Sequence, residues 1–202
     1  GYDPATPTRL IYVDCTRSDD SGDGLSEATA KRSIKAGVDA AKVADVENVV
    51  IVAPGIYTGP DNREINFGGY NIKLRSKRGS PETIVDLQRQ GIFLYIKSHE
   101  SKENTWLDGF TIKNGQGQYN GGAVEVSNSS GLTVKNCVFS DNRVGGSGGA
   151  LYAYNSNVDV FNTRFFNNHY KQNEDSGYPE SGGGAIYFGS GTYNVSNSEF
   201  LN

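Results

Sequence analysis

The chain of 202 residues has no long apolar run and no excess of positive charge. No segment approaches the run of about 20 apolar residues that a membrane-spanning helix needs, so the sequence predicts no membrane span. Lysine and arginine total 19 against 23 aspartate and glutamate residues, and the two signs are interspersed. Since nucleic-acid binding requires a basic patch, this charge pattern argues against that function.

Glycine is abundant, with 26 residues, and pairs of glycines open three segments that superimpose on one another. Each segment reads Gly-Gly-Ala-aliphatic, then an alternating stretch, then Asn-x-x-Phe; the segments span residues 121–139, 148–165 and 183–200. Self-similarity at a period of roughly 20 to 50 residues is typical of a solenoid. The segments are rich in Val, Tyr, Phe, Thr, Asn and Gly, which favours coils of parallel strands over helical repeats.

Strand alternation sorts each repeat into inward and outward columns. The inward columns include Val124, Leu151 and Ile186, and an aromatic stack is predicted for Phe139, Phe165 and Phe200. Asparagine recurs at positions 136, 162 and 197, where the chain must bend, and asparagine tolerates left-handed turns well. Each coil is therefore predicted to carry about three short strands, with an asparagine ladder at one corner.

The domain organisation is predicted as one β-helix over residues 1–202, in keeping with 36% apolar content. Residues 1–48 would form a first strand and a capping helix, and residues 49–202 would form the coils. The helix is expected over residues 33–44, with Ser33 as its N-cap and Ile34, Val38 and Ala41 on one face. An insertion at about 169–181 would loop out from one edge.

Two stretches resemble known proteins. The segments Tyr12-Val13-Asp14, 19–26, 33–41 and Ala53-Pro54-Gly55-Ile56-Tyr57 resemble the opening of secreted right-handed parallel β-helix proteins, a group that includes pectate-lyase-like polysaccharide lyases. The Gly-Gly-Ala-aliphatic and Phe-x-x-Asn elements resemble the repeats of chlamydial-type polymorphic outer-membrane adhesins. The resemblance implies an all-β, right-handed parallel β-helix with an N-terminal capping α-helix, in an extracellular or cell-surface setting. Because this fold carries catalysts, adhesins and fibres alike, the resemblance does not select one activity.

The two cysteines, Cys15 and Cys137, are predicted to be free thiols. They lie about four coils apart, which at roughly 4.8 Å per coil is far beyond disulfide reach. Cys137 shares a column of small residues with Thr163 and Ser198, so we expect it to be buried.

Three tyrosines form the first candidate binding site. Tyr152 and Tyr187 fall in one outward column, which also contains Glu125, and Tyr154 lies nearby. Aromatic side chains at coil spacing can bind sugars or a partner protein, and they can also form a ladder that only stabilises the sheet. Both interpretations stay open at this point.

Four aspartates, Asp14, Asp19, Asp20 and Asp23, lie in a loop rich in glycine and serine. Calcium takes several oxygen ligands at short spacing, so the loop is a candidate calcium site, although it lacks the spacing of an EF-hand. The alternative is an Asx-rich turn whose side chains bond their own backbone. Apart from calcium, no cofactor is indicated.

Two functions compete. The first is a non-catalytic extracellular module for surface structure, adhesion or fibre assembly, with a cell-surface glycan as a partner. Because the sequence stops within a repeat, we expect either self-association through an open C-terminal coil or continuation into a longer solenoid. The alternative is a polysaccharide lyase acting on uronates, which needs a basic residue near clustered carboxylates. The candidate residues are Lys135 near Asp159, with Glu125, Arg164 and Glu199 on other columns. Arg164 and Glu199 can also be explained as a simple cross-strand ion pair.

Overall fold

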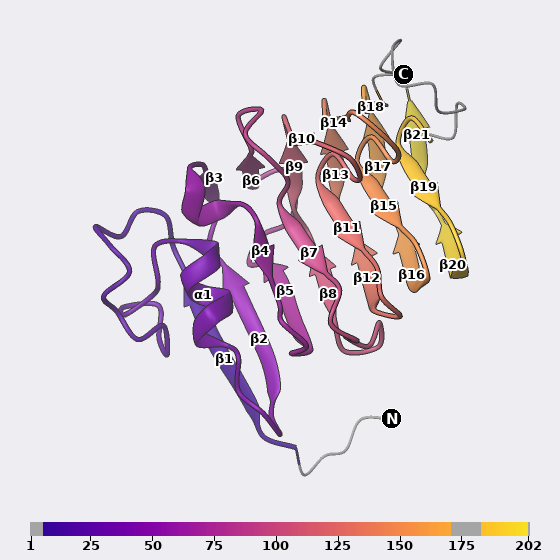
Figure 1. Cartoon of the computed structure of the whole chain (residues 1–202). Helices are drawn as coiled ribbons and strands as arrows, with labels where there is room; N and C mark the ends of the chain where they lie inside the picture. Colours follow the sequence, from indigo (N-terminus) through magenta and orange to yellow (C-terminus); the bar gives the residue numbers. More distant parts are fainter. Residues whose placement is uncertain (1–5, 171–182, 202) are drawn as a thin grey trace.

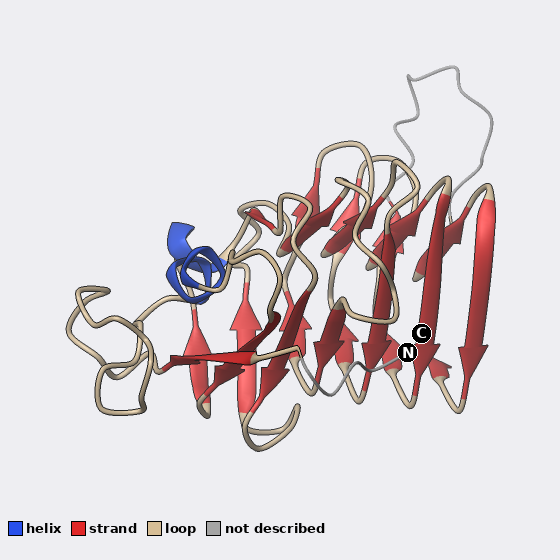
Figure 2. Cartoon of the chain, turned by 90° about the horizontal axis from the view of Figure 1, so that it is seen from below, coloured by secondary structure: helices blue, strands red, loops and turns tan. Residues whose placement is uncertain are grey.

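The structure, a computed structural model, describes residues 6–170 and 183–201. Within these residues the strands form four sheets, and every pairing between neighbouring strands is parallel. Figures 1 and 2 show the strands stacked side by side along one axis, with an α-helix at the N-terminal end. The predicted fold class, an all-β, right-handed parallel β-helix with an N-terminal helix, is confirmed.

Each sheet takes one strand from each successive coil. The seven-stranded sheet contains, in spatial order, β1 (Thr8–Val13), β2 (Glu47–Val52), β5 (Ile72–Ser76), β8 (Trp106–Asp108), β12 (Gly131–Lys135), β16 (Ser156–Phe161) and β20 (Gly191–Ser196). The six-stranded sheet contains β3 (Gly55–Tyr57), β6 (Thr83–Asp86), β9 (Thr111–Lys113), β13 (Val138–Ser140), β17 (Arg164–Phe166) and β21 (Glu199–Leu201). The five-stranded sheet contains β4 (Ile65–Asn66), β7 (Leu94–Ile96), β11 (Val124–Val126), β15 (Leu151–Ala153) and β19 (Ile186–Phe188).

A fourth, three-stranded sheet was not predicted. It consists of β10 (Gln116–Gly117), β14 (Arg143–Val144) and β18 (His169–Tyr170). Each strand has two residues, too few to show an alternation of apolar and polar side chains, and glycines lie in or beside two of them. The local sequence therefore carries no strand signal there.

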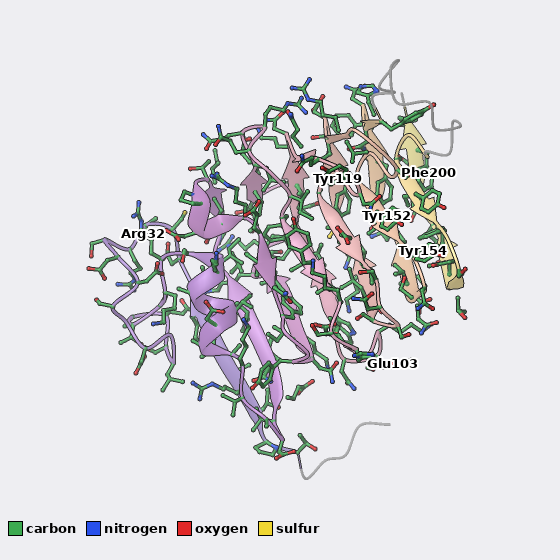
Figure 3. All side chains as sticks on the ribbon, viewed as in Figure 1. Arg32, Glu103, Tyr119, Tyr152, Tyr154 and Phe200 are labelled. Carbon is green, nitrogen blue, oxygen red and sulfur yellow. The ribbon has the colours of Figure 1, made fainter. Side chains whose placement is uncertain are left out.

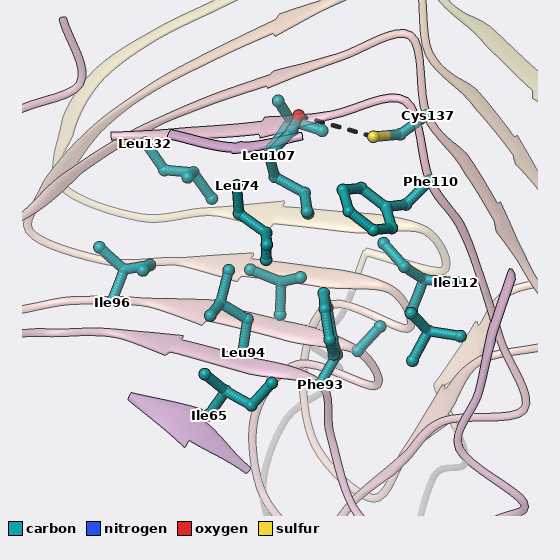
Figure 4. Close-up of a cluster of buried hydrophobic side chains, with 14 of the residues drawn as sticks. Ile65, Leu74, Phe93, Leu94, Ile96, Leu107, Phe110, Ile112, Leu132 and Cys137 are labelled. Atoms are coloured by element: carbon teal, nitrogen blue, oxygen red, sulfur yellow. Dashed lines mark hydrogen bonds between the residues drawn. The ribbon is translucent and has the colours of Figure 1, made fainter. Parts of the chain in front are cut away.

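The core is a continuous interior lined by matching columns. Leu74, Leu107 and Val134 pair in register across β5, β8 and β12, and all three are fully buried. Figure 4 shows Leu74 and Leu107 next to each other in this core. Cys137 lies at the edge of the same cluster, where its Sγ contacts the Leu107 carbonyl at 3.6 Å and burial raises the pKa of its thiol to about 12. Both cysteines are free, as predicted.

The predicted aromatic stack is present. The rings of Phe139 and Phe165 are 5.0 Å apart with planes 5° from parallel, and Phe165 and Phe200 repeat this geometry at 5.0 Å and 4°. Phe139 and Phe165 are buried, whereas Phe200, on the last described coil, is 51% exposed. Like side chains therefore lie directly above one another, which is the basis of the fold assignment.

Two asparagine ladders fix the corners. The predicted ladder has Asn136, Asn162 and Asn197 in left-handed conformations with φ of 54°, 44° and 48°, and Asn162 donates its side-chain amide to the Asn136 side-chain oxygen at 2.8 Å. The second ladder, formed by Asn142 and Asn168, is buried and was not predicted. Asn142 donates its side-chain amide to the Ile112 carbonyl and to the Asn168 side-chain oxygen, both at 3.0 Å. These bonds satisfy polar groups inside the core.

The N-terminal helix α1 (Ile34–Ala40) is shorter than predicted. Ser33 is its N-cap, and its hydroxyl accepts a hydrogen bond from the Ala36 backbone amide at 3.2 Å. Val38 and Ala41 are buried as expected, but the helix stops at Ala40 because the following residues turn directly towards β2. In the residues that the structure describes, no helix is long and apolar enough to cross a membrane.

The free edge of β1 is covered by the loop that precedes the helix, and not by the helix itself. The Tyr12 amide donates to the Gly24 carbonyl and the Lys31 amide donates to the Tyr12 carbonyl, at 2.8 and 2.9 Å. In Figure 1 this loop lies at the indigo end of the molecule, beyond β1. The loop blocks edge pairing, whereas α1 covers the inner side of β1 and β2.

Most of the predicted insertion at about 169–181 falls outside the described residues. Its first two residues, His169 and Tyr170, form β18.

Candidate functional site

The outer face of the five-stranded sheet carries one continuous column of large side chains. Strand register aligns Tyr95 of β7 with Glu125 of β11, Glu125 with Tyr152 of β15, and Tyr152 with Tyr187 of β19. All four side chains are half-buried, while their strand neighbours on both sides point into the core. This tyrosine column, defined as Tyr95, Glu125, Tyr152 and Tyr187, contains two of the three predicted binding residues.

Two members of the column stack as rings. The Tyr152 and Tyr187 ring centroids are 5.1 Å apart with planes 6° from parallel. Each ring therefore covers one face of the other, and the stack presents ring edges and hydroxyl groups to the outside. In this stack the two tyrosines offer a ligand their hydroxyl groups, and the second face of the Tyr152 ring is not covered by Tyr187.

Tyr154, the third predicted residue, lies beside the column. Its ring centroid is 6.5 Å from that of Tyr152, with planes 20° apart, and the side chain is 47% exposed (Figure 3). Because Tyr154 is the most exposed of the three, it adds an accessible aromatic surface at the margin of the column. The structure thus brings Tyr152, Tyr154 and Tyr187 together.

Glu125 interrupts the aromatic column. Its carboxylate makes no hydrogen bond or ion pair with any residue in the described part of the chain. Burial raises the pKa of Glu125, and the nearby Lys97 ammonium acts in the opposite direction. Burial also raises the pKa of Tyr95 and of Tyr152, and the negative charge of Glu125 adds to both shifts. A half-buried acid without a partner, next to two tyrosines, is the most unusual ionisable group on this face.

The four aspartates of the N-terminal loop do not converge. Asp14 accepts from the Thr16 amide at 2.9 Å, Asp19 from the Ser21 amide at 2.9 Å, and Asp23 from the Leu25 amide at 2.9 Å. Each of these is an Asx turn, closed two residues ahead.

Asp20 bonds a different segment of the loop. It accepts from the backbone amides of Arg32 and Ser33 at 2.7 and 2.8 Å. Residues 6–170 and 183–201 contain no group of three or more acidic, histidine or cysteine side chains placed to hold a metal ion. The arrangement is that of an Asx-rich turn.

The outer face of the seven-stranded sheet is charged and contains the chain's single tryptophan. The Lys73 ammonium lies 4.3 Å and the Lys135 ammonium 3.6 Å from the Trp106 ring centroid. The two lysines come from β5 and β12, on opposite sides of β8. Sequence alternation alone could have placed Trp106 on the outer face, because its neighbour Leu107 is an inward residue.

The candidates for lyase chemistry are dispersed over these faces. Lys135 lies 3.7 Å from Asp108, and Asp159 instead pairs with Lys102 at 3.0 Å. Glu125 lies on the five-stranded sheet, away from Lys135. Arg164 and Glu199 form an exposed cross-strand ion pair at 2.9 Å, as their register predicts. The structure therefore does not bring the proposed base together with a group of carboxylates.

Cys15 lines a hollow of about 380 Å³ between the N-terminal loop and η1 (Pro60–Asn62). The buried Tyr57 hydroxyl accepts from the Cys15 backbone amide at 3.4 Å and donates to the Ala53 carbonyl at 2.9 Å. Gly55, with φ of +154°, packs so closely that a Cβ would lie 2.4 Å from the Cys15 Sγ. Cys15 therefore has a structural role, because it packs against Tyr57 and Gly55 at the first turn.

Comparison with known proteins does not assign this chain to a family. No protein-family model matches the chain, and no curated protein matches it. Among solved structures, the chain is similar to a rhamnogalacturonan lyase, with 19% sequence identity, a TM-score of 0.47, and coverage of 96% of this chain and 56% of that one. The chain thus spans little more than half the length of that protein. The class defined here is a parallel β-helix.

Proposed function

We propose that this chain is a non-catalytic, extracellular β-helix module that binds a cell-surface glycan and acts in adhesion or surface structure. The observation that carries the proposal is the tyrosine column on the outer face of the five-stranded sheet. The Tyr152 and Tyr187 hydroxyl groups lie on neighbouring strands, about 4.8 Å apart, and the Glu125 carboxylate and the Tyr95 hydroxyl continue the row on the next two strands. A row of regularly spaced hydrogen-bonding groups on a rigid support suits a polymer with regularly spaced hydroxyls better than a single small molecule.

The pairing of charges on the other faces supports a non-catalytic role. On the seven-stranded sheet, Lys73 pairs with Glu47, Lys135 with Asp108 and Lys102 with Asp159. A general base must be free to contact the substrate, whereas each of these lysines lies in an ion pair with a carboxylate of the chain. These three lysines and their three carboxylates are therefore paired with one another.

Assembly belongs to the same proposal. We infer that adhesin-like repeats of this kind act in longer stacks, formed either by a second copy or by further coils. Phe200 and Leu201, on the last described coil, are 51% and 52% exposed and are the residues that such a stack would cover. Light scattering at rising concentration measures the self-association, and a strictly monomeric particle would speak against stacking of copies.

A binding survey tests the proposal. The chain is incubated with immobilised neutral, acidic and amino polysaccharides, and retention is compared for the unchanged chain, Tyr152→Ala and the control Tyr12→Phe. Tyr12 lies on the seven-stranded sheet, so its variant keeps the tyrosine column intact. We expect retention on at least one polysaccharide, lost in Tyr152→Ala only.

The same samples test the alternative of a lyase. Polygalacturonate and alginate are incubated with the chain and calcium, and unsaturated products are measured by their absorbance. No product is expected. Any product formation, or an absence of retention on every polysaccharide, would contradict the proposed function.

A further inference from the structure

The break in the tyrosine column lies at one residue. Tyr152 has one ring face against Tyr187, and its other face is directed towards β11, where Glu125 stands in register. On the far side of β11, Tyr95 is the next ring. Tyr95 and Tyr152 are two strands apart, or about 9.5 Å at the usual strand spacing. The glutamate side chain is shorter than a tyrosine ring, so it occupies only the inner part of this interval.

The chemistry of this position favours a cation. The Glu125 carboxylate has no hydrogen-bond or ion-pair partner in residues 6–170 and 183–201. A half-buried carboxylate without a partner gains most from a ligand that brings a positive charge and N–H donors. The faces of the flanking tyrosines attract cations as well, through the ring quadrupole.

The chain itself provides an example of such a contact. The Lys97 ammonium lies 4.3 Å from the Tyr95 ring centroid, and Lys97 is close enough to Glu125 to influence its ionisation. The other charged group near this part of the column is Glu64, whose charge acts on Tyr95. The surroundings of Tyr95 and Glu125 thus carry two carboxylates and one ammonium, which leaves one negative charge for a ligand to neutralise.

We infer that Glu125, between Tyr95 and Tyr152, is a subsite for the ammonium group of an amino sugar. The inference rests on the proposed function, because it specifies which glycan the tyrosine column binds. Glu125 would accept hydrogen bonds from the ammonium, the rings of Tyr95 and Tyr152 would flank it, and the tyrosine hydroxyls would bond the sugar hydroxyls. A sugar polymer with free amino groups is therefore preferred over the same polymer with N-acetyl groups.

A matched pair of ligands tests this inference. Short β-linked glucosamine oligomers and the fully N-acetylated oligomers of the same length are titrated into the intact chain by calorimetry. They share the sugar backbone and differ at the 2-amino group of each residue, which is a charged ammonium in one oligomer and a neutral acetamide in the other. We expect the free-amine oligomer to bind about tenfold more tightly, and we expect Glu125→Gln to reduce that difference to about twofold or less.

Two further variants separate the subsite from general charge attraction. Glu82→Gln removes one negative charge from an exposed side chain without a partner in the described residues, and should leave the preference unchanged. Lys97→Gln removes the internal ammonium, and should tighten binding of the free-amine oligomer about three- to tenfold. Unfolding curves of all variants establish that each is folded at the temperature of the titration.

The outcomes distinguish the two proposals. If both oligomers bind with equal affinity, or if Glu125→Gln and Glu82→Gln behave alike, the ammonium subsite is wrong while glycan binding stands. If neither these oligomers nor any polysaccharide of the survey binds, the proposed function fails together with the subsite.

Discussion

The two broad outer faces of this β-helix use the same backbone spacing in opposite ways. On the seven-stranded sheet, opposite charges alternate between strands, as in Arg75, Asp108 and Lys135, which are aligned in register. On the five-stranded sheet, rings follow one another and a single acid stands among them. On the first face Lys73, Lys102 and Lys135 lie in ion pairs with carboxylates, whereas the second face leaves hydroxyl groups and one carboxylate available.

This difference between the two faces indicates where a ligand can bind on a solenoid. Because strand register places like positions above one another, each outward column acts as a unit. A column of paired charges is stable by itself and offers a ligand little, since binding would have to replace existing contacts. A column with one unpaired group gains from a ligand without losing a contact.

The largest effect is expected for the shared core. Phe165→Ala removes a fully buried ring from the middle of the aromatic stack and should lower the free energy of unfolding by about 3–5 kcal/mol. Phe166→Ala on the same strand is the control, since Phe166 points outward and is half-buried; its loss should be about 1 kcal/mol. Urea unfolding measures both, and equal losses would contradict the assignment of inward and outward columns.

Trp106 tests the charged face. Trp106→Leu removes the ring that two lysine ammonium groups contact, so the free energy of unfolding should fall by about 1 kcal/mol, and less in concentrated salt. Trp106→Phe keeps a ring and should lose less. Glycan retention should be unchanged in both variants. If retention disappears with Trp106 while the fold is kept, recognition belongs to the seven-stranded sheet.

The strands of the regular coils could be predicted from sequence, because three copies show which residues share a column. The alignment of Phe139, Phe165 and Phe200 and the bends at Asn136 and Asn162 follow from the repeat alone. The short fourth sheet and the buried ladder of Asn142 and Asn168 could not, since glycine-rich segments show no alternation and a buried asparagine looks like a turn residue in sequence.

The candidate site was predicted in part. Tyr152, Tyr154 and Tyr187 lie together as expected, because they belong to adjacent regular repeats. The repeats place Glu125 in the outward column of Tyr152 and Tyr187, but its position next to Tyr95 was missed, because Tyr95 lies in an earlier, irregular coil whose register could not be derived from the repeats. Only strand pairing shows that Glu125 stands between two tyrosines.

A smaller effect is expected for one hydroxyl of the tyrosine column. Tyr152→Phe keeps the ring stacked on Tyr187 but removes a hydrogen-bonding group from the outer edge. Glycan affinity should weaken about three- to tenfold, while the free energy of unfolding changes by less than about 0.5 kcal/mol. Calorimetric titration and urea unfolding measure the two quantities. Unchanged affinity would mean that the hydroxyl does not contact the ligand.

The smallest effect is the pH dependence that Glu125 contributes. Burial raises its pKa in the folded chain, so between the unfolded and folded pKa values the folded chain binds more protons. The contribution of Glu125 to the free energy of unfolding is therefore fully present below its unfolded pKa of about 4.3. This stabilisation is lost as the pH rises through the folded pKa. Glu125→Gln should match the unchanged chain in acid and be more stable at neutral pH, by less than about 1 kcal/mol.

Urea unfolding midpoints of the unchanged chain and of Glu125→Gln, taken across pH 4 to 7, measure this difference. The effects of all other titrating groups are the same in the two proteins and cancel when the midpoints are subtracted. Glu82→Gln serves as the control and should show no such trend. A Glu125→Gln variant that is less stable than the unchanged chain at neutral pH would indicate that the carboxylate has a favourable partner.

The most direct test of the account is a map of the bound glycan by NMR. Amide chemical shifts are recorded while the oligosaccharide that binds best in the survey is added. We predict that the changes concentrate on Tyr95, Glu125, Tyr152 and Tyr187, with the Trp106 indole signal unmoved. Changes centred on Trp106 and Lys135, with the tyrosine column silent, would contradict the claim that the five-stranded sheet is the recognition face.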